Sequence, residues 1–159
     1  AAGDMDGDGV VEIVAGSRVG GLHLDKLDGE PQWSKSVGVE ITGLAMADLT
    51  GDGNLELTAA SKNFCVLVTD VHGNILWNCN VGEAILDLAV GDIDGDGRPE
   101  IVVGTEGGMV RVLDAEGNIT GTFKTGGNVT AVTLVARKGD GTMQIVAGAD
   151  DGHVYGDIR

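Results

Sequence analysis

The segment Gly-Asp-Ile-Asp-Gly-Asp-Gly at residues 91–97 decides the fold, because closely related segments occur at residues 3–9 and 47–53. The leading Asp of the three copies stands at positions 4, 48 and 92, so the period is 44 residues without a gap. A further step of 44 residues reaches a degenerate fourth copy of the segment at residues 136–141. A fixed period of this length predicts a repeat architecture in which each copy is one supersecondary unit.

The match between the copies extends beyond this acidic loop. Gly29, Gly73 and Gly117 occupy one position of the repeat and are expected to form hairpin turns. The third copy reads as four short strands rich in Val, Ile and Leu, with Gly, Asp and Asn turns between them: Ile85–Gly91, Glu100–Thr105, Met109–Asp114 and Ile119–Thr125. Four antiparallel strands that repeat about every 40–50 residues are typical of a propeller blade.

The sequence therefore predicts an all-β fold, a β-propeller segment of about four 44-residue blades. We expect one domain over residues 1–159, with blades at 1–38, 39–82, 83–126 and 127–159. The first blade is expected to lack its innermost strand and the last its outermost strand, so both are incomplete. We expect part of a longer propeller, or half of one completed by another chain, and a free four-bladed ring is the alternative.

The composition is that of a folded and strongly acidic chain. Hydrophobic residues make up 42% of the 159 residues and 28 are Gly, which excludes disorder and indicates many tight turns. The 25 acidic and 10 basic residues give a formal net charge of −15, so nucleic acid and anionic membranes would be repelled. The longest apolar runs, such as Val110–Leu113, are too short to span a bilayer. Residue 1 is Ala and no signal peptide precedes it, so we expect a mature or excised piece.

The acidic loop has the form Asp-x-Asp-Gly-Asp-Gly-x-x-Glu, which indicates a calcium site. Side chains at its first, third and fifth positions and a backbone carbonyl at its seventh can converge on one cation, as in an EF-hand, and the glycines permit the curl. An EF-hand closes with a Glu before a helix, three residues later than the Glu found here. In this chain the Glu opens a strand instead. The pattern therefore predicts a strand–loop–strand calcium site.

Three such sites are predicted, each with four side chains and one carbonyl, and their donors are all oxygen, which selects calcium over zinc or copper. The first has Asp4, Asp6, Asp8 and Glu12 with the Val10 carbonyl; the second has Asp48, Thr50, Asp52 and Glu56 with the Asn54 carbonyl; the third has Asp92, Asp94, Asp96 and Glu100 with the Arg98 carbonyl. Two carboxylates about 4 Å apart repel by about 4 kcal/mol at an effective dielectric constant of 20, so a loop of three or four needs a cation. The alternative is that these are only Asp- and Gly-rich turns.

The copies differ in the charge that they offer to a metal. Thr50 stands where the other two sites have Asp, so we expect weaker binding there. In the fourth copy Ala136 and Gln144 replace acids, Lys138 occupies the third position and Asp140 remains, so we expect that loop to be empty. Two to three calcium ions with a structural role are therefore expected.

At this point the sequence resembles the FG-GAP/VCBS repeats of integrin α-subunit-like propellers. Residues 91–104 and their two sibling segments carry the resemblance, which spans the chain. It implies a seven- or eight-bladed propeller, mostly extracellular, that serves cell adhesion and ligand binding. Some members of the family lie within carbohydrate-active enzymes.

A second resemblance concerns the outer strands. Residues 24–33 and 70–77 look like the tryptophan-docking segments of quinoprotein propellers, with Trp33 and Trp77 at one position of the repeat and Gly121 at the third. The resemblance implies that these tryptophans pack one blade against the next. It implies no cofactor site.

The function expected is a calcium-stabilised extracellular or cell-surface module that binds protein or glycan and is not an enzyme. No residues are assigned to catalysis, and the ten bases are scattered rather than gathered into a site. The alternative is a non-catalytic scaffold of a secreted carbohydrate-active enzyme such as a polysaccharide lyase. A quinoprotein oxidoreductase is a third hypothesis, which requires a chromophore. Self-association or completion by further blades is expected through open strand edges.

Cys65 and Cys79 lie on successive strands of the second copy. A three-residue hairpin loop would place them opposite each other for a disulfide, whereas a register shift of one residue would leave two free thiols. The sequence leaves both alternatives open.

Overall fold

The computed structural model describes residues 1–139 and 141–158, and these residues form fifteen strands in four antiparallel sheets without a helix. Blade one contains β1 (Ala2–Gly3), β2 (Glu12–Gly16), β3 (Gly21–Lys26) and β4 (Pro31–Ser36). Blade two contains β5 (Ile41–Ala47), β6 (Glu56–Ser61), β7 (Cys65–Thr69) and β8 (Ile75–Asn80). Blade three contains β9 (Ile85–Gly91), β10 (Glu100–Thr105), β11 (Met109–Leu113) and β12 (Ile119–Lys124). Blade four contains β13 (Val129–Ala136), β14 (Met143–Ala149) and β15 (Val154–Ile158).

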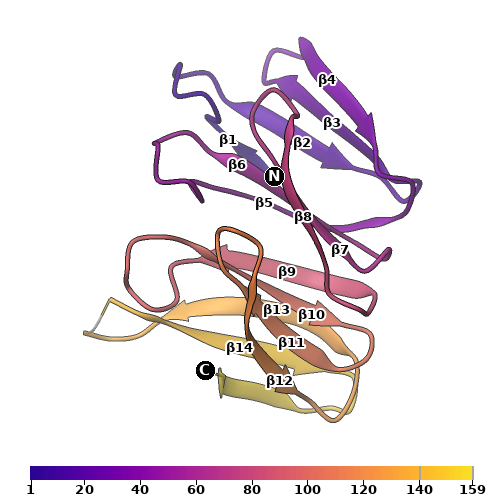
Figure 1. Cartoon of the computed structure of the whole chain (residues 1–159), viewed down its shortest axis with the longest axis vertical. Helices are drawn as coiled ribbons and strands as arrows, with labels where there is room; N and C mark the ends of the chain where they lie inside the picture. Colours follow the sequence, from indigo (N-terminus) through magenta and orange to yellow (C-terminus); the bar gives the residue numbers. More distant parts are fainter. Residues whose placement is uncertain (140, 159) are drawn as a thin grey trace.

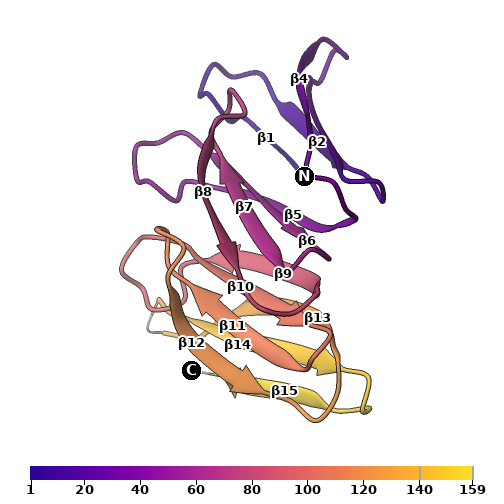
Figure 2. The ribbon, with the colours of Figure 1, turned by 45° about the vertical axis from the view of Figure 1, so that its right-hand side comes forward.

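This arrangement confirms the all-β propeller segment with incomplete end blades. Each sheet follows chain order, and the sheets stack in sequence from the indigo end to the yellow end in Figures 1 and 2. The innermost strands adjoin, since β9 packs against both β5 and β13. No helix in the described part of the chain is long and apolar enough to cross a membrane.

The structure corrects two details of the expected strands. Blade one keeps a two-residue remnant of its innermost strand, because Ala2 and Gly3 pair with Ile13 and Glu12. The third and fourth strands of blade three each end one residue earlier than expected, at Leu113 and Lys124. The innermost strand of blade four is complete, and within the described residues its sheet has three strands.

A bulge between the third and fourth strands of blade two determines whether Cys65 and Cys79 can form a disulfide. In blade two Thr69 pairs with Ile75 but Val68 pairs with Trp77, so Leu76 is the extra residue. The resulting shift sets Cys65 opposite Asn80 and Cys79 opposite Val66. Because neighbouring residues of a strand face opposite sides, the two thiols lie on different faces of the blade and are free.

The core lies between the blades in three clusters of aliphatic side chains. Leu22 and Leu24 of blade one meet Leu57 of blade two, and Val66 and Val68 of blade two pack in one cluster with residues of blade three. A third cluster joins blades three and four. Adjacent blades therefore bury apolar side chains against each other, as expected of stacked repeats that lack a core of their own.

The two tryptophans pack between blades, which confirms the role that was expected of them. The indole nitrogen of Trp33 donates to the Val71 carbonyl at 2.8 Å, and that of Trp77 donates to the Ala115 carbonyl at 2.8 Å. Each ring lies against a hairpin glycine of the next blade, Gly73 or Gly117, and a Cβ there would come within 3.0 Å or less of it. Between blades three and four, Phe123 and Tyr155 make an edge-to-face contact instead, with ring centroids 5.9 Å apart.

Candidate metal centre

The three acidic loops have equivalent places in the fold. Residues 4–12, 48–56 and 92–100 each connect the innermost strand of a blade to its second strand, and they lie along the left edge of the molecule in Figure 1. The curl of each loop uses two glycines with positive φ, such as Gly95 at 83° and Gly97 at 90°. The repeat therefore presents its acidic groups along one edge.

The leading Asp of each loop holds the curl by accepting backbone hydrogen bonds. Gly9 N donates to Asp4 Oδ2 at 2.9 Å, and the equivalent bonds from Gly53 to Asp48 and from Gly97 to Asp92 are each 2.8 Å. The second oxygen of Asp48 accepts from Gly51 and Asp52, at 2.6 and 3.1 Å. These bonds bind the loop to its first carboxylate and leave less than the full set of oxygen lone pairs for a metal.

The structure brings the first three acidic side chains of two loops together. In the first and third loops, one oxygen from each carboxylate lies within 4.8 Å of the others, in the groups Asp4, Asp6, Asp8 and Asp92, Asp94, Asp96. In the second loop Thr50 replaces the middle acid, and Asp52 N donates to Asp48 instead of to a carboxylate at position 50. Of the three loops, the second therefore has the fewest acidic side chains, and it is the loop for which weaker calcium binding was expected.

The three predicted carbonyl donors belong to residues whose amide groups also stabilise the loops. The N–H groups of Val10, Asn54 and Arg98 donate to the Asp two residues earlier, at 2.7, 2.8 and 2.7 Å. These bonds are Asx turns, which bend the chain toward the side chains of the fifth position. The backbone at the seventh position therefore stays close to the carboxylates.

The Glu at the end of each loop turns one oxygen back to the loop. Oε2 of Glu12 accepts from Met5 N, that of Glu56 from Leu49 N and that of Glu100 from Ile93 N, each at 2.8 Å. Burial raises the pKa of Glu56 and of Glu100, and the neighbouring aspartates raise it further. The Glu therefore stabilises the loop by accepting this backbone hydrogen bond.

Two carboxylate oxygens of the first loop are buried without a hydrogen-bond partner. Glu12 is 1% exposed, and its Oε1 has no donor among the described residues. The same is true of Asp4 Oδ1 in the same loop. Buried anionic oxygens without a partner are costly, so two of them in one loop call for a cation or ordered water.

Sequence reasoning did not identify the role of Lys26. Its ammonium lies 3.2 Å from Asp8 Oδ2, and it lowers the pKa of Asp8 after the hydrogen bond from Val10 N, which is the larger cause. The two later copies have Asp70 and Asp114 at this position of the repeat. The signal that could have identified Lys26 is a base that replaces an acid at one position of the repeat, on β3, the strand that pairs with the strand after the metal loop.

The fourth loop lies partly outside the described residues. Asp140, the acid that this loop keeps, is not among them, and Ala136 and Gln144 lie within the paired strands β13 and β14. The start of β14 binds the third loop, because Met143 N donates to the Ile93 carbonyl at 3.0 Å. The expectation that this loop is empty stays a prediction.

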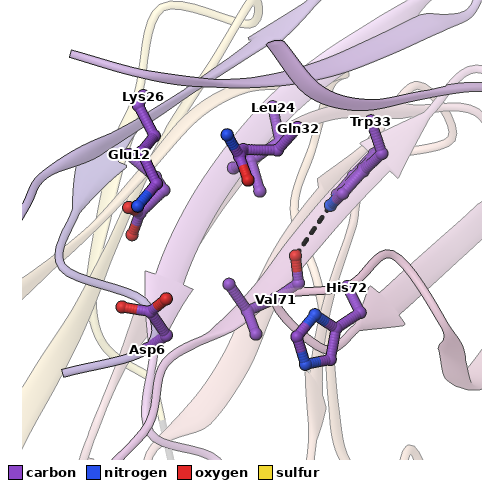
Figure 3. Close-up of a pocket in the computed structure, with 8 residues that line it drawn as sticks. All are labelled: Asp6, Glu12, Leu24, Lys26, Gln32, Trp33, Val71 and His72. Atoms are coloured by element: carbon purple, nitrogen blue, oxygen red, sulfur yellow. Dashed lines mark hydrogen bonds between the residues drawn. The ribbon is translucent and has the colours of Figure 1, made fainter. Parts of the chain in front are cut away.

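A cavity of about 190 Å³ lies beside the first loop, between blades one and two. Figure 3 shows Asp6 and Glu12 on one side of it and Val71 and His72 on the other, with Trp33 bonded to the Val71 carbonyl. A second cavity of about 390 Å³ shares Asp6 and His72 and continues to the second loop at Asp52. The acidic loops therefore border polar space between neighbouring blades.

Three solved structures show the fold of this chain. BBS1N in complex with ARL6DN, in crystals soaked with mercury, matches with a TM-score of 0.78 and 20% sequence identity. The alignment covers 99% of this chain and 49% of the matched chain. The same complex soaked with lead has a TM-score of 0.77, 19% identity and coverages of 95% and 43%. Saccharomyces cerevisiae Sqt1 has a TM-score of 0.76, 14% identity and coverages of 95% and 41%. The chain thus spans about half the length of these structures or less.

A family comparison is more specific. No curated protein sequence matches the chain. The family model of the lambda-carrageenase β-propeller domain matches residues 63–156, which are 94 of the 159 residues. This match includes the third acidic loop and all of blade three. The chain therefore belongs to the family of the lambda-carrageenase β-propeller domain.

Proposed function

We propose that this chain is a calcium-stabilised propeller module. The observation that carries the proposal is the pair of buried oxygens without partners, Asp4 Oδ1 and Glu12 Oε1, at the two ends of a loop in which the carboxylates of Asp4, Asp6 and Asp8 converge. A calcium ion takes six to eight oxygen ligands, so it can use oxygens that the backbone leaves free. The donor set of each loop, which has neither His nor Cys, fits this ion.

The residues that would hold calcium are those of the three loops. The first and third loops offer three Asp side chains, a carbonyl at the seventh position and the free oxygen of the closing Glu. The second loop offers one acid fewer because of Thr50. When bound, calcium neutralises carboxylates that repel each other and fixes the connection between the inner two strands of a blade. The loops themselves supply the curl and the hydrogen bonds that precede binding.

The contribution of calcium to stability depends on its concentration. With dissociation constants of extracellular modules, about 10⁻⁴–10⁻³ M, millimolar calcium adds about 0.4–1.4 kcal/mol for each site. Such sites are useful where calcium is in the millimolar range. We therefore propose a location outside the cell or on its surface, which the FG-GAP/VCBS resemblance also implies.

The partner that we propose is a protein or a glycan, bound through the loops at the edge of the blades. The similar structure of BBS1N is in complex with ARL6DN, and the matching family model is that of the lambda-carrageenase β-propeller domain, which together support a protein or a glycan as the partner. A chain with a formal net charge of −15 repels polyanions. Direct binding therefore favours a neutral glycan or a basic protein surface.

The family match favours a second function, a non-catalytic scaffold within a carbohydrate-active enzyme. In this hypothesis the chain supplies blades that support or orient a catalytic part, and it is not an enzyme itself. Binding of a glycan by the isolated chain would favour the first function. Absence of glycan binding, together with a stabilising calcium effect, would favour the scaffold.

The test is a calorimetric calcium titration of chelator-stripped protein, with thermal melts in parallel. We expect two to three sites and a melting temperature that rises with calcium. Asp4→Asn and Asp92→Asn should each remove one site, whereas Asp28→Asn, which removes an acid from a hairpin outside the loops, should remove none. No binding up to about 10 mM calcium, above the range of extracellular modules, would overturn the proposal.

A further inference from the structure

One face of blade one is open at positions that are buried in every other blade. Val14 packs toward blade two, so Ile13 and Ala15, its neighbours on β2, face the other way. Ile13 is 39% exposed and Ala15 is also exposed. The residues at the same positions in the later blades are between 0% and 3% exposed: Leu57 and Ala59, Ile101 and Val103, Ile145 and Ala147. These apolar positions are buried in blades two, three and four and exposed in blade one, which indicates that blade one lacks a neighbour on this face.

The hairpin of blade one shows the same difference. Gly73 and Gly117 each lie under an indole ring from the preceding blade, whereas a Cβ on Gly29 would meet nothing within 4 Å. The carbonyls that accept the indole N–H belong to Val71 and Ala115, which are partly buried. Leu27 stands at that position in blade one and is 64% exposed. A positive φ of 89° alone accounts for Gly29 in its turn, but the open space above it and the exposed Leu27 need a further reason.

We propose that this face binds a further four-stranded blade whose outermost strand carries a Trp. The indole would pack on Gly29 and donate its N–H to the Leu27 carbonyl, while aliphatic side chains of that blade cover Ile13 and Ala15. The occupant is of the same kind as blade two and joins Ala1 in the same way that blade two joins blade three. The lengths of the similar structures, of which this chain covers 49% at most, agree with further blades.

A second copy of this chain fits the face less well. The sequence contains two Trp residues, and both are already bonded within the chain. Blade four, which would meet blade one in a head-to-tail pair, has three strands in the described part of the chain and no outer strand to carry an indole. Its exposed Val135 and Val154 would cover part of the apolar face and leave Gly29 open.

The experiment supplies the missing blade from the chain itself. Residues 45–88, one full period, are duplicated in front of Ala1, which stands at the same position of the repeat as Ala89. The Trp of the duplicated segment then precedes Gly29 by 40 residues, as Trp77 precedes Gly117. The duplicated Ile85–Leu88 also restores the inner strand of which β1 is the remnant.

The extended chain should melt at least about 5 °C above the original chain, a shift that one buried blade interface readily supplies. Replacement of the Trp in the duplicated segment by Ala should remove most of this rise. Gly29→Ala should lower the melting temperature more in the extended chain than in the original, because only there does the new methyl group meet an indole. Ile13→Glu should be mild in the original chain and severe in the extended one, with Ile101→Glu severe in both.

The proposal is overturned if the extended chain melts no higher and if Gly29→Ala and Ile13→Glu cost the same in both chains. It is also overturned if the original chain sediments as a dimer that Ile13→Glu dissociates, because the occupant is then a second copy. All melts are made with calcium and with chelator. The comparison of the two chains under one condition does not depend on calcium binding, so the proposed metal sites can fail while this interface stands.

Discussion

Lys26 Nζ lies 3.2 Å from Asp8 Oδ2, so one carboxylate of the first acidic loop already holds a cation. The contact arises because β2 and β3 pair Glu12 with Lys26, which places the ammonium beside the end of the loop. The hydrogen bond to Asp8 also raises the pKa of Lys26, which favours its charged ammonium form. Calcium that binds to this loop must compete with Lys26.

Replacement of Lys26 by Met should therefore strengthen calcium binding at the first loop. The calcium affinity of this loop should rise about two- to five-fold, which corresponds to the free energy of one exposed ion pair. Calorimetry of the variant should show tighter binding at one site and the others unchanged. Lys62→Met, which removes an ion pair with Glu40 far from the loops, is the control and should leave all sites as they are. Weaker binding in Lys26→Met would mean that the ammonium supports the loop.

Replacement of Glu12 by Gln should have effects of opposite sign with and without calcium. The amide oxygen can keep the bond from Met5 N, and the change removes a buried negative charge whose second oxygen has no partner. Without calcium the variant should melt about 2–4 °C higher, as expected for relief of about 1 kcal/mol in a domain of this size. With saturating calcium it should lose most of the stabilisation at this loop.

The control for this change is Glu30→Gln in the exposed hairpin of blade one. It should alter neither the melt without calcium nor the calcium response. If Glu12→Gln destabilises the protein equally in both conditions, then the Glu acts only as a brace and contributes nothing to calcium binding.

Replacement of Gly117 by Ala should cost more than the same change at Gly82. Both glycines have similar φ angles, 86° and 84°, so an alanine pays about 1–2 kcal/mol of backbone strain at either position. At Gly82 the new Cβ meets nothing within 4 Å, whereas at Gly117 it lies 2.7 Å from the ring of Trp77. We expect a further 1–3 kcal/mol, roughly, from this overlap. Denaturant unfolding measures both costs, and equal values would mean that the indole moves aside freely.

The phenol of Tyr155 should titrate above its ordinary pKa. It donates to Asp151 Oδ2 at 2.6 Å, which raises the pKa of Tyr155 above 10.0 and lowers that of Asp151 below 3.8. A raised pKa in the folded state means that this stability is complete below pH 10.0 and is lost as the pH rises through the folded pKa of Tyr155. The lowered pKa of Asp151 means that stability is present above pH 3.8 and is lost as the pH falls through its folded pKa.

Tyr155 is the single Tyr of the sequence, so ultraviolet absorbance follows its ionisation directly. Asp151→Asn should move the midpoint down toward 10.0. Asp150→Asn, which breaks a bond with Asn128 instead, should leave the midpoint in place. An unchanged midpoint in Asp151→Asn would show that burial, and not the carboxylate, raises the pKa of Tyr155.

The period of 44 residues predicted the blades, their order and the position of the acidic loops. It did so because each blade repeats the same apolar and turn residues, and local sequence determines short strands and tight hairpins. The resemblance of residues 24–33 and 70–77 to tryptophan-docking segments predicted that Trp33 and Trp77 pack between blades. All of these features depend on residues close together in the chain or on the similarity of one repeat to the next.

Other features depended on contacts that residue type alone does not set. The bulge at Leu76 shifts one strand by a residue, and since successive side chains face opposite sides, this alone separates Cys65 from Cys79. The ion pair of Lys26 with Asp8 follows from the register of β2 and β3. The exposure of Ile13, at a position where Leu57 and Ile101 are buried, depends on which blade has a neighbour. The sequence by itself determined what each blade is, and the tertiary structure decided what each blade touches, because burial and pairing belong to the assembly of blades rather than to any one of them.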